Sequence, residues 1–130
     1  MNRIMRLYFV LALSIVSVAY AENDTKAPRV IETYPINGST DVDPSLNEIS
    51  VTFNEQMMDG NWSWAYTEKN EFPTVKGQPY YTDNYTKNNL PVILEPNKEY
   101  TIWINSEKFK NFKDKAGNPA LPFKFTFKTR

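Results

Sequence analysis

Residues 49–53 read Ile49-Ser50-Val51-Thr52-Phe53, so apolar and polar side chains alternate along the stretch. Successive side chains of an extended strand point to opposite faces, and this alternation therefore predicts a strand with one buried and one wet face. The same pattern recurs twice near the C-terminus, in residues 100–105 (Tyr100, Ile102 and Ile104 against Thr101, Trp103 and Asn105) and in residues 123–128 (Phe123, Phe125 and Phe127 against Lys124, Thr126 and Lys128). Together these stretches predict an all-β protein.

Shorter apolar runs and turn signals fill the intervals between these strands. Val92 and Leu94 alternate over a short stretch, and Val30 opens a less regular strand that Pro35 ends, because proline has no N–H to give to a ladder. Reversals are predicted at Asn37-Gly38, Asp59-Gly60, Pro96-Asn97 and Gly117-Asn118-Pro119. No amphipathic stretch of helical period exceeds about two turns. Many short strands separated by turns predict a sandwich or a barrel.

The N-terminus has the organisation of a secretory signal peptide. Arg3 and Arg6 precede an apolar run over residues 7–18, and Ala19-Tyr20-Ala21 offers small residues where a signal peptidase reads them. We expect cleavage after Ala21, which leaves residues 22–130 as one domain that is exported to the periplasm or the cell exterior. A retained membrane anchor is the alternative. The apolar run is too short to cross a bilayer comfortably and no second run follows, so we expect no transmembrane protein after cleavage.

The expected mature chain is close to neutral. The sequence has 15 basic and 15 acidic residues, and the loss of Arg3 and Arg6 leaves 13 against 15, a net charge of −2. Such a domain has no general attraction for nucleic acid or anionic membranes. The one basic cluster is interleaved with Glu107 and Asp114, which predicts a solvated loop. Its members are Lys108, Lys110, Lys113 and Lys115.

The sequence is poor in catalytic side chains. It has no His and no Cys, which excludes histidine general bases, thiolate nucleophiles and the usual zinc sites. Four glycines provide no phosphate-binding loop, and no serine lies in a Gly-x-Ser-x-Gly turn. Glu55 and Asp59 are the nearest candidates for a carboxylate pair, although a solvated turn explains them equally simply. We therefore expect no enzyme and no cofactor, and a fold held by apolar burial without disulfides.

Several loop residues have the hard oxygen ligands that calcium prefers. They are Asp41, Asp43, Asp114 and Asn118. The spacing of an EF-hand is missing, and such side chains commonly cap turns. If calcium binds, Asp114 and Asn118 are the expected ligands.

A series of blocks along the chain resembles the bacterial Ig-like family named after S-layer proteins, the SbsA-type Ig-like domain. The blocks are residues 27–30, 34–38, 41–43, 49–57, 94–101, 114–118 and 125–129. The resemblance implies an immunoglobulin- or fibronectin-III-like β-sandwich of about seven strands. It also implies a module of exported and surface proteins with a spacer, adhesion or interaction role and no catalytic machinery. Residues 59–89 depart from the shorter connection typical of the family.

Two blocks also have a physical interpretation of their own. Leu94-x-Pro96-x-x-x-Tyr100 is typical of a tyrosine corner, in which a tyrosine at the start of a strand bonds back to nearby backbone and fixes the crossover between sheets. Asp114 followed by Gly117-Asn118 predicts a tight loop, in which the carboxylate accepts backbone N–H groups and the glycine takes a positive φ.

The departing segment, residues 59–89, is unusually aromatic. Trp62 and Trp64 share one side of the segment if it is extended, and together with Tyr80 and Tyr81 they can form a platform. Exposed aromatic faces stack on sugar rings or anchor protein interfaces. A sandwich of this type also buries a tryptophan on its third strand, so a core role stays open for both tryptophans.

These observations predict an exported, stand-alone Ig-like domain that acts as a non-catalytic binding, adhesion or structural module at the bacterial cell envelope. Its partner is a protein or a glycan, bound through a sheet edge or through the aromatic segment. The alternative is a carbohydrate-binding module that uses residues 59–89.

Overall fold

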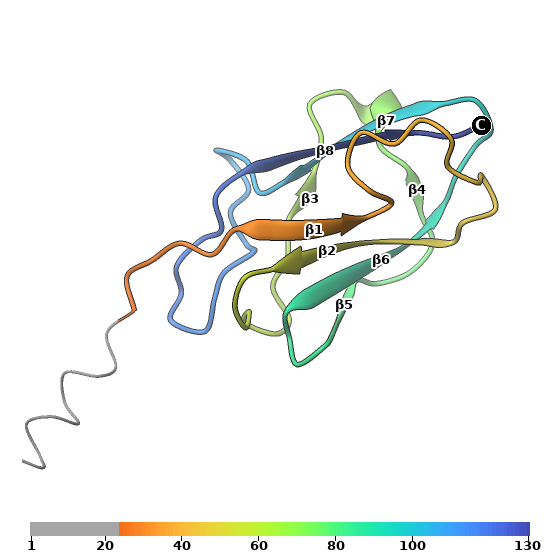
Figure 1. Ribbon diagram of the computed structural model, residues 1–130. Coiled ribbons are helices and arrows are strands. Elements are labelled where there is room, and N and C mark those ends of the chain that lie inside the picture. Colours follow the sequence, from red (N-terminus) through yellow and green to blue (C-terminus); the bar gives the residue numbers. More distant parts are fainter. Residues whose placement is uncertain (1–23) are drawn as a thin grey trace, which may run out of the picture.

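The computed structural model describes residues 24–130, so the expected signal peptide and its cleavage point lie outside the described residues. Two antiparallel sheets face each other, and the described chain enters at one end of the sandwich and leaves at the other (Figure 1). The all-β sandwich is confirmed, with eight strands between residues 24 and 130 where about seven were expected. Within the described part, no helix has the length and apolar character needed to cross a membrane.

The larger sheet has the order β1-β2-β6-β4, and β5 also pairs with β6. Its strands are β1 (Val30–Tyr34), β2 (Glu48–Phe53), β4 (Thr74–Val75), β5 (Tyr80–Thr82) and β6 (Lys87–Ile93). β2 and β6 form its centre, with Ile49 opposite Leu90 and Val51 opposite Asn88. Ile49, Val51 and Phe53 form the predicted buried face. Ser50, predicted on the wet face, is also buried, because it lies between its cross-strand neighbours Tyr34 and Asn89.

The smaller sheet has the order β3-β7-β8. It consists of β3 (Trp64–Ala65), β7 (Glu99–Ile104) and β8 (Phe123–Lys128), and a single 3-10 turn, η1 (Lys69–Glu71), follows β3. Tyr100, Ile102 and Ile104 face the core opposite Phe127, Phe125 and Phe123. Burial of such aromatic and branched side chains is the main stabilising contribution in a chain without cysteine.

Asn105 departs from the alternation that placed it on the wet face. β7 ends at Ile104, and Asn105 turns inward with φ 59° and no exposed surface. Its side-chain amide donates to the carbonyls of Phe112 and Ala120 at 3.0 Å each, and its Oδ1 accepts from the Phe112 N–H at 3.0 Å. Asparagine tolerates this left-handed backbone better than most residues do. Asn105 therefore ties the loop before β8 to the end of β7.

Pro91 divides the outer edge of the larger sheet into β4 and β5. The Pro91 carbonyl accepts from the Lys76 N–H at 3.1 Å, so it points to the outer edge. In an antiparallel ladder the nitrogen and the carbonyl of one residue point to the same neighbour, so the nitrogen of Pro91, which lacks a hydrogen, also points to that edge. The ladder breaks there because proline cannot donate to it. Gly77 passes the ring closely, since a Cβ on Gly77 would lie 3.2 Å from Pro91 Cγ. The strand predicted around Val92 and Leu94 is thus β6, which begins five residues earlier, at Lys87.

The free edge of β8 is covered by the chain that follows β1. The Gly38 N–H donates to Thr126 O at 2.7 Å, and the Lys128 N–H donates to Ser39 O at 2.8 Å. Covering an edge in this way protects it from pairing with other chains.

The tyrosine corner and the tight loop are both present. The Glu95 N–H donates to Tyr100 Oη at 2.8 Å across the Pro96 turn, at the crossover from the larger to the smaller sheet. In the loop, Asp114 Oδ1 accepts from the Ala116 and Asn118 N–H groups at 3.0 and 2.8 Å. Gly117 takes φ 91°, a conformation that residues with a side chain rarely adopt.

Candidate functional site

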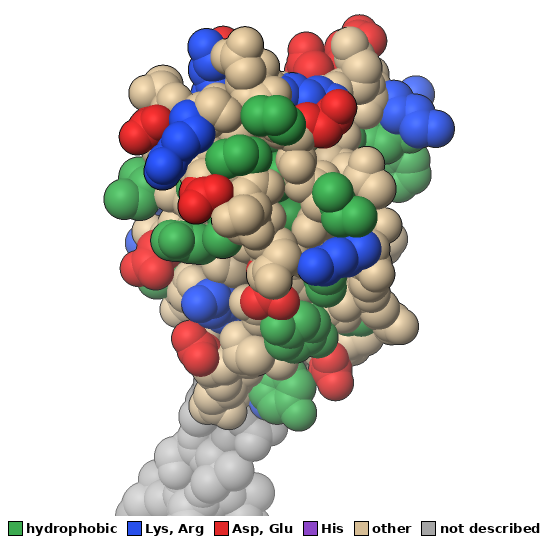
Figure 2. Space-filling view, turned by 90° about the vertical axis from the view of Figure 1, so that its right-hand side faces the viewer, with side chains coloured by type: hydrophobic (Ala, Val, Ile, Leu, Met, Phe, Trp, Pro, Cys, Tyr) green, Lys and Arg blue, Asp and Glu red, His purple; other side chains and the backbone are tan. Residues whose placement is uncertain are grey.

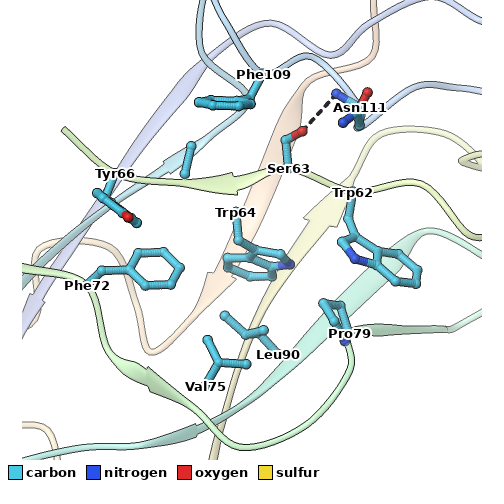
Figure 3. A pocket seen from close by; sticks show the side chains of 11 residues that line it. Trp62, Ser63, Trp64, Tyr66, Phe72, Val75, Pro79, Leu90, Phe109 and Asn111 are labelled. Carbon is cyan, nitrogen blue, oxygen red and sulfur yellow. Dashed lines mark hydrogen bonds between the residues drawn. The ribbon is translucent and has the colours of Figure 1, made fainter. Parts of the chain in front are cut away.

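The aromatic segment opens a cleft between β3 and the β4 and β5 edge of the opposite sheet. This central cleft has a volume of about 610 Å³. Trp64, Phe72, Val75 and Leu90 line it, while Trp62 and Pro79 stand at one end (Figure 3). All five residues from Trp62 to Tyr66 contribute to its lining. A concave apolar site of this size is typical of a ligand pocket.

Trp64 serves both as part of the core and as part of the cleft. Its indole Nε1–H donates to Asn88 Oδ1 at 2.8 Å, a bond that joins β3 of one sheet to β6 of the other. Its ring meets Phe112 edge-on, with 5.9 Å between centroids. The side chain is half-buried, so the core interpretation and the binding interpretation each describe part of its surface.

A second cleft continues beyond Trp62 and Pro79, which line both. This tyrosine cleft, of about 700 Å³, contains Tyr80, Tyr81 and Tyr85. The Trp62 and Tyr81 rings lie 6.5 Å apart, and the Tyr81 and Tyr85 rings lie 6.3 Å apart, all at tilted angles. The three rings thus form one connected aromatic surface.

Hydrogen bonds hold two of the tyrosines in place. Tyr81 Oη donates to Asn61 O at 3.2 Å, and burial raises the pKa of Tyr81 well above its usual range. Tyr80 Oη donates to Glu48 Oε2 at 2.5 Å, and this bond raises the pKa of Tyr80. Both hydroxyls therefore stay protonated at neutral pH, and the two phenols act as neutral polar groups.

A third cleft adjoins the other end of the central cleft. This outer cleft, of about 670 Å³, shares Tyr66 and Phe109 with the central cleft and adds Trp103 of β7. We call the three clefts together the aromatic groove. It contains each of the predicted platform residues: Trp62 and Trp64 line the central cleft, and Trp62, Tyr80 and Tyr81 line the tyrosine cleft.

Two aromatic residues of the groove escaped the sequence prediction. Phe109 lies within the lysine-rich stretch that was interpreted as a solvated loop, and 55% of its surface is exposed. Trp103 was assigned only to the wet face of a strand. The usable signal was a large aromatic side chain in an otherwise charged, exposed loop.

The groove is nearly free of charge. Of the residues that the structure describes, no Asp, Glu, Lys or Arg lines the central cleft. Asp59 belongs to the tyrosine cleft, and Glu107 and Lys108 belong to the outer cleft. Neutral hydrogen-bonding side chains border the three clefts: Thr67, Gln78, Thr82, Asn84, Ser106 and Asn111. The arrangement suits binding, since it places no acid–base pair beside the central cleft.

Three carboxylates gather elsewhere, beside the loop of Asp114. Oxygen atoms of Asp24, Glu55 and Asp114 lie within 4.8 Å of one another. Burial raises the pKa of Glu55 to about 7, and the neighbouring Asp114 and Asp24 add to the shift. Burial opposes the charge of Asp114, but hydrogen bonds from the Asn118 side chain and backbone hold its pKa below the usual value. Among residues 24–130, this cluster is the group of acids that can offer oxygen ligands to a divalent cation.

The other proposed calcium ligands are dispersed or turned away. Asn118 directs its amide nitrogen to Asp114 Oδ2 at 3.0 Å, and so acts as a donor inside the loop. Asp43 Oδ1 accepts from Ser45 in a turn, and Asp41 lies 3.5 Å from Arg130. Glu55 and Asp59 also do not share a site, because Glu55 joins the acidic cluster and Asp59 borders the tyrosine cleft. Calcium binding stays a prediction that rests on Asp114.

Charges of both signs are mixed on the face of the molecule that Figure 2 shows. Figure 2 shows basic, acidic and apolar side chains interspersed on one face of the molecule, with no broad field of one sign. Lys108, Lys110 and Lys115 are exposed, and Lys115 Nζ lies 5.6 Å from the centre of the Tyr85 ring.

Fold and loops together define the chain as a small immunoglobulin-like β-sandwich with an aromatic groove. The sequence profile of the bacterial Ig-like domain matches residues 24–129, and the chain belongs to that family, which confirms the resemblance drawn from its sequence blocks. No curated protein sequence matches the chain.

Two solved structures of S-layer proteins are similar in fold. One is the S-layer protein rSbsC(31-844), with 16% identity and a TM-score of 0.43 over 81% of this chain. The other is the surface layer protein SbsC, domains 1-6, with 16% identity and a TM-score of 0.44 over 82% of this chain. This chain spans 14% of the length of either S-layer chain.

Proposed function

We propose that the chain is an exported, non-catalytic binding module of the bacterial cell envelope, and that it holds its partner in the aromatic groove. The observation that carries the proposal is the groove itself: three adjoining clefts lined by exposed or half-buried aromatic rings. A folded monomer rarely leaves a connected apolar surface of this kind open unless something binds there.

The lack of catalytic chemistry at the groove supports a binding role. The chain has no His and no Cys. Glu55, whose carboxyl pKa is raised to about 7, belongs to the acidic cluster and lines none of the three clefts. The N-terminal leader pattern and membership of a bacterial Ig-like family support an envelope location.

Affinity capture tests this function. The mature chain, residues 22–130, would be immobilised and incubated with detergent-solubilised envelope extract, beside matched columns of Trp62→Ala and Tyr34→Ala. Tyr34 is an exposed tyrosine of β1, outside the groove. We expect one envelope component to be retained by the wild type and by Tyr34→Ala, and lost from Trp62→Ala.

Equal retention on all three columns would place the binding surface outside the groove. Turnover of an envelope polymer by the purified chain would refute the non-catalytic role.

A further inference from the structure

The occupant that best fits the aromatic groove is a polymer with flat apolar faces, hydroxyl edges and no charge. We propose that the groove binds a neutral, linear, β-linked glycan, with Trp62 as the central stacking platform. This inference rests on the proposed binding function and names the chemical class of the partner.

The groove combines the two kinds of surface that a sugar chain presents. A pyranose ring has an apolar face of C–H groups and an edge of hydroxyls. The aromatic rings of the groove match the faces, because an apolar face packs well on the π-surface of Trp or Tyr. The neutral amides and hydroxyls on the rim, among them Gln78, Asn84 and Asn111, match the hydroxyl edge. Such groups both donate and accept, as hydroxyls do.

Charge selects among glycans. An anionic polymer would require Lys or Arg along its path. Lys108 lines the outer cleft and Lys115 Nζ lies 5.6 Å from the Tyr85 ring, but Asp59 of the tyrosine cleft and Glu107 of the outer cleft place a negative charge in each of the same two clefts. Among residues 24–130, the central cleft has no charged lining residue. A neutral chain therefore fits, and an acidic one does not.

The strand edges beside the groove disfavour an extended peptide as the occupant. A peptide that adds to a sheet relies on a ladder of main-chain bonds. β3 and β4 have two residues each and β5 has three, so each edge offers few such bonds. Pro91 also interrupts the ladder of β6 between β4 and β5. Stacking on aromatic rings needs only side chains, which the lining residues provide.

The shared borders of adjoining clefts imply a chain of several sugars. Trp62 and Pro79 separate the tyrosine cleft from the central cleft, and Tyr66 and Phe109 separate the central cleft from the outer cleft. Each cleft falls within the range of about 300–1,000 Å³ that holds a small ligand. Because an all-equatorial β-1,4-linked chain is flat and extended, one oligosaccharide can pass from the tyrosine cleft over Trp62 into the central cleft and stack on successive rings.

Calorimetric titration of the mature chain with defined oligosaccharides tests the inference. The probes are chitohexaose, cellohexaose, their trisaccharides, and an oligogalacturonate of equal length as the anionic control. We expect one neutral series to bind, with the hexasaccharide tighter than the trisaccharide, and the oligogalacturonate not to bind. Trp62→Ala should weaken hexasaccharide binding about tenfold or more, because Trp62 borders two clefts.

Two further variants separate stacking from folding. Trp62→Phe keeps an aromatic ring and should retain part of the affinity, whereas Phe109→Ala should weaken the hexasaccharide and spare the trisaccharide. Tyr34→Ala should bind as the wild type does. Circular dichroism of each variant checks the fold.

Envelope extract divided into protease-treated and periodate-treated portions distinguishes the two proposals. Capture that survives protease and is lost after periodate supports a glycan. Capture that survives periodate and is lost after protease overturns the glycan while leaving the binding function intact. If the wild type retains no component of the untreated extract that Trp62→Ala fails to retain, the binding function itself is refuted. Binding of no neutral hexasaccharide, or equal binding by Trp62→Ala, would also overturn the inference.

Discussion

Asn105 shows how much of this fold depends on single polar side chains within the core. Its amide satisfies two carbonyls and one N–H of the loop before β8, and the residue has no exposed surface. Water cannot replace these bonds once the loop is closed, so each unpaired group would carry the full cost of its desolvation. Asn105 therefore stabilises the loop mainly through its hydrogen bonds.

We expect Asn105→Ala to lower the free energy of unfolding by about 2–4 kcal/mol, because it leaves the Phe112 N–H and the Ala120 carbonyl buried without partners, whereas the Phe112 carbonyl keeps its bond from the Ala120 N–H. Urea denaturation measures the change. Asn70→Ala, at an exposed position of η1, is the matched control and should stay within about 0.5 kcal/mol of the wild type. A loss below about 1 kcal/mol for Asn105→Ala would contradict the assigned bonds.

Glu55 should make stability depend on pH. Its pKa rises from 4.5 to about 7 on folding, so the folded state binds the proton more tightly than the unfolded state does. The stabilising effect of the protonated group is present below pH 4.5 and is lost as the pH rises to about 7. The pKa of Asp114 is lowered on folding, so the ionised Asp114 stabilises the fold above pH 3.8. That contribution is lost only as the pH falls below 3.8, outside the range in which Glu55 titrates. Because the chain has no His, few other groups titrate between these values.

The free energy of unfolding should therefore decrease between pH 5 and pH 8, and Glu55→Gln should flatten this dependence. The decrease should be modest, because Glu55 is only half-buried and water screens its neighbours. Chemical denaturation across the pH series gives both slopes. Glu32→Gln, an exposed residue of β1, should keep the wild-type slope. An equally steep dependence in Glu55→Gln would assign the titration to another group.

At the scale of elements, the tyrosine corner fixes the crossover from β6 to β7. Tyr100→Phe keeps the ring, which is almost fully buried, and removes the acceptor of the Glu95 N–H. We expect a loss of about 1–2 kcal/mol. A thermal midpoint lower by roughly 4–8 °C for each kcal/mol would show it.

Tyr80→Phe is the control for the tyrosine corner. It removes a hydroxyl of the same kind whose partner, Glu48, lies near the surface, and it should change stability by less than about 0.5 kcal/mol. Equal losses in Tyr80→Phe and Tyr100→Phe would mean that the crossover does not depend on the corner bond.

The long elements could be predicted from sequence and the short ones could not. β2, β7 and β8 each bury one face, so their side chains alternate. Only the second half of β6 could be predicted, because its first half contains the buried polar residues Asn88 and Asn89. Asn88 bonds to Trp64 of β3, and Asn89 bonds to Tyr80 and Thr82 of β5, and local periodicity contains none of these partners. β4 and β5 exist because Pro91 breaks their common edge, a long-range effect that local periodicity does not contain.

The same limit applies to the site. Trp62, Trp64, Tyr80 and Tyr81 could be selected because they lie in one aromatic segment, but their division between two clefts depends on the position of Pro79. Phe109 and Trp103 join the groove from a loop and a strand that are distant in sequence. The acidic cluster likewise unites Asp24, Glu55 and Asp114 through the packing of the whole chain.

At the scale of the whole molecule, the sandwich is a stable frame around one open side. The edge of β8 is covered by the chain after β1, whereas β3 and the β4 and β5 edge border the aromatic groove. The core is formed without disulfides, since the sequence has no cysteine. The two sheets therefore stabilise the domain, and the open side presents the proposed binding surface.

The three tryptophans allow a direct test of whether the partner binds in the aromatic groove. Trp62 borders the tyrosine and central clefts, Trp64 borders the central cleft, and Trp103 borders the outer cleft. In a ¹⁵N-labelled mature chain, each indole N–H gives its own resonance, and the component recovered from envelope extract can be titrated against all three. The account predicts that the indole signals shift together as the partner binds, while the amides of β1 stay in place. Unmoved indole signals at saturation, with shifts confined to β1 or to the acidic cluster, would contradict it.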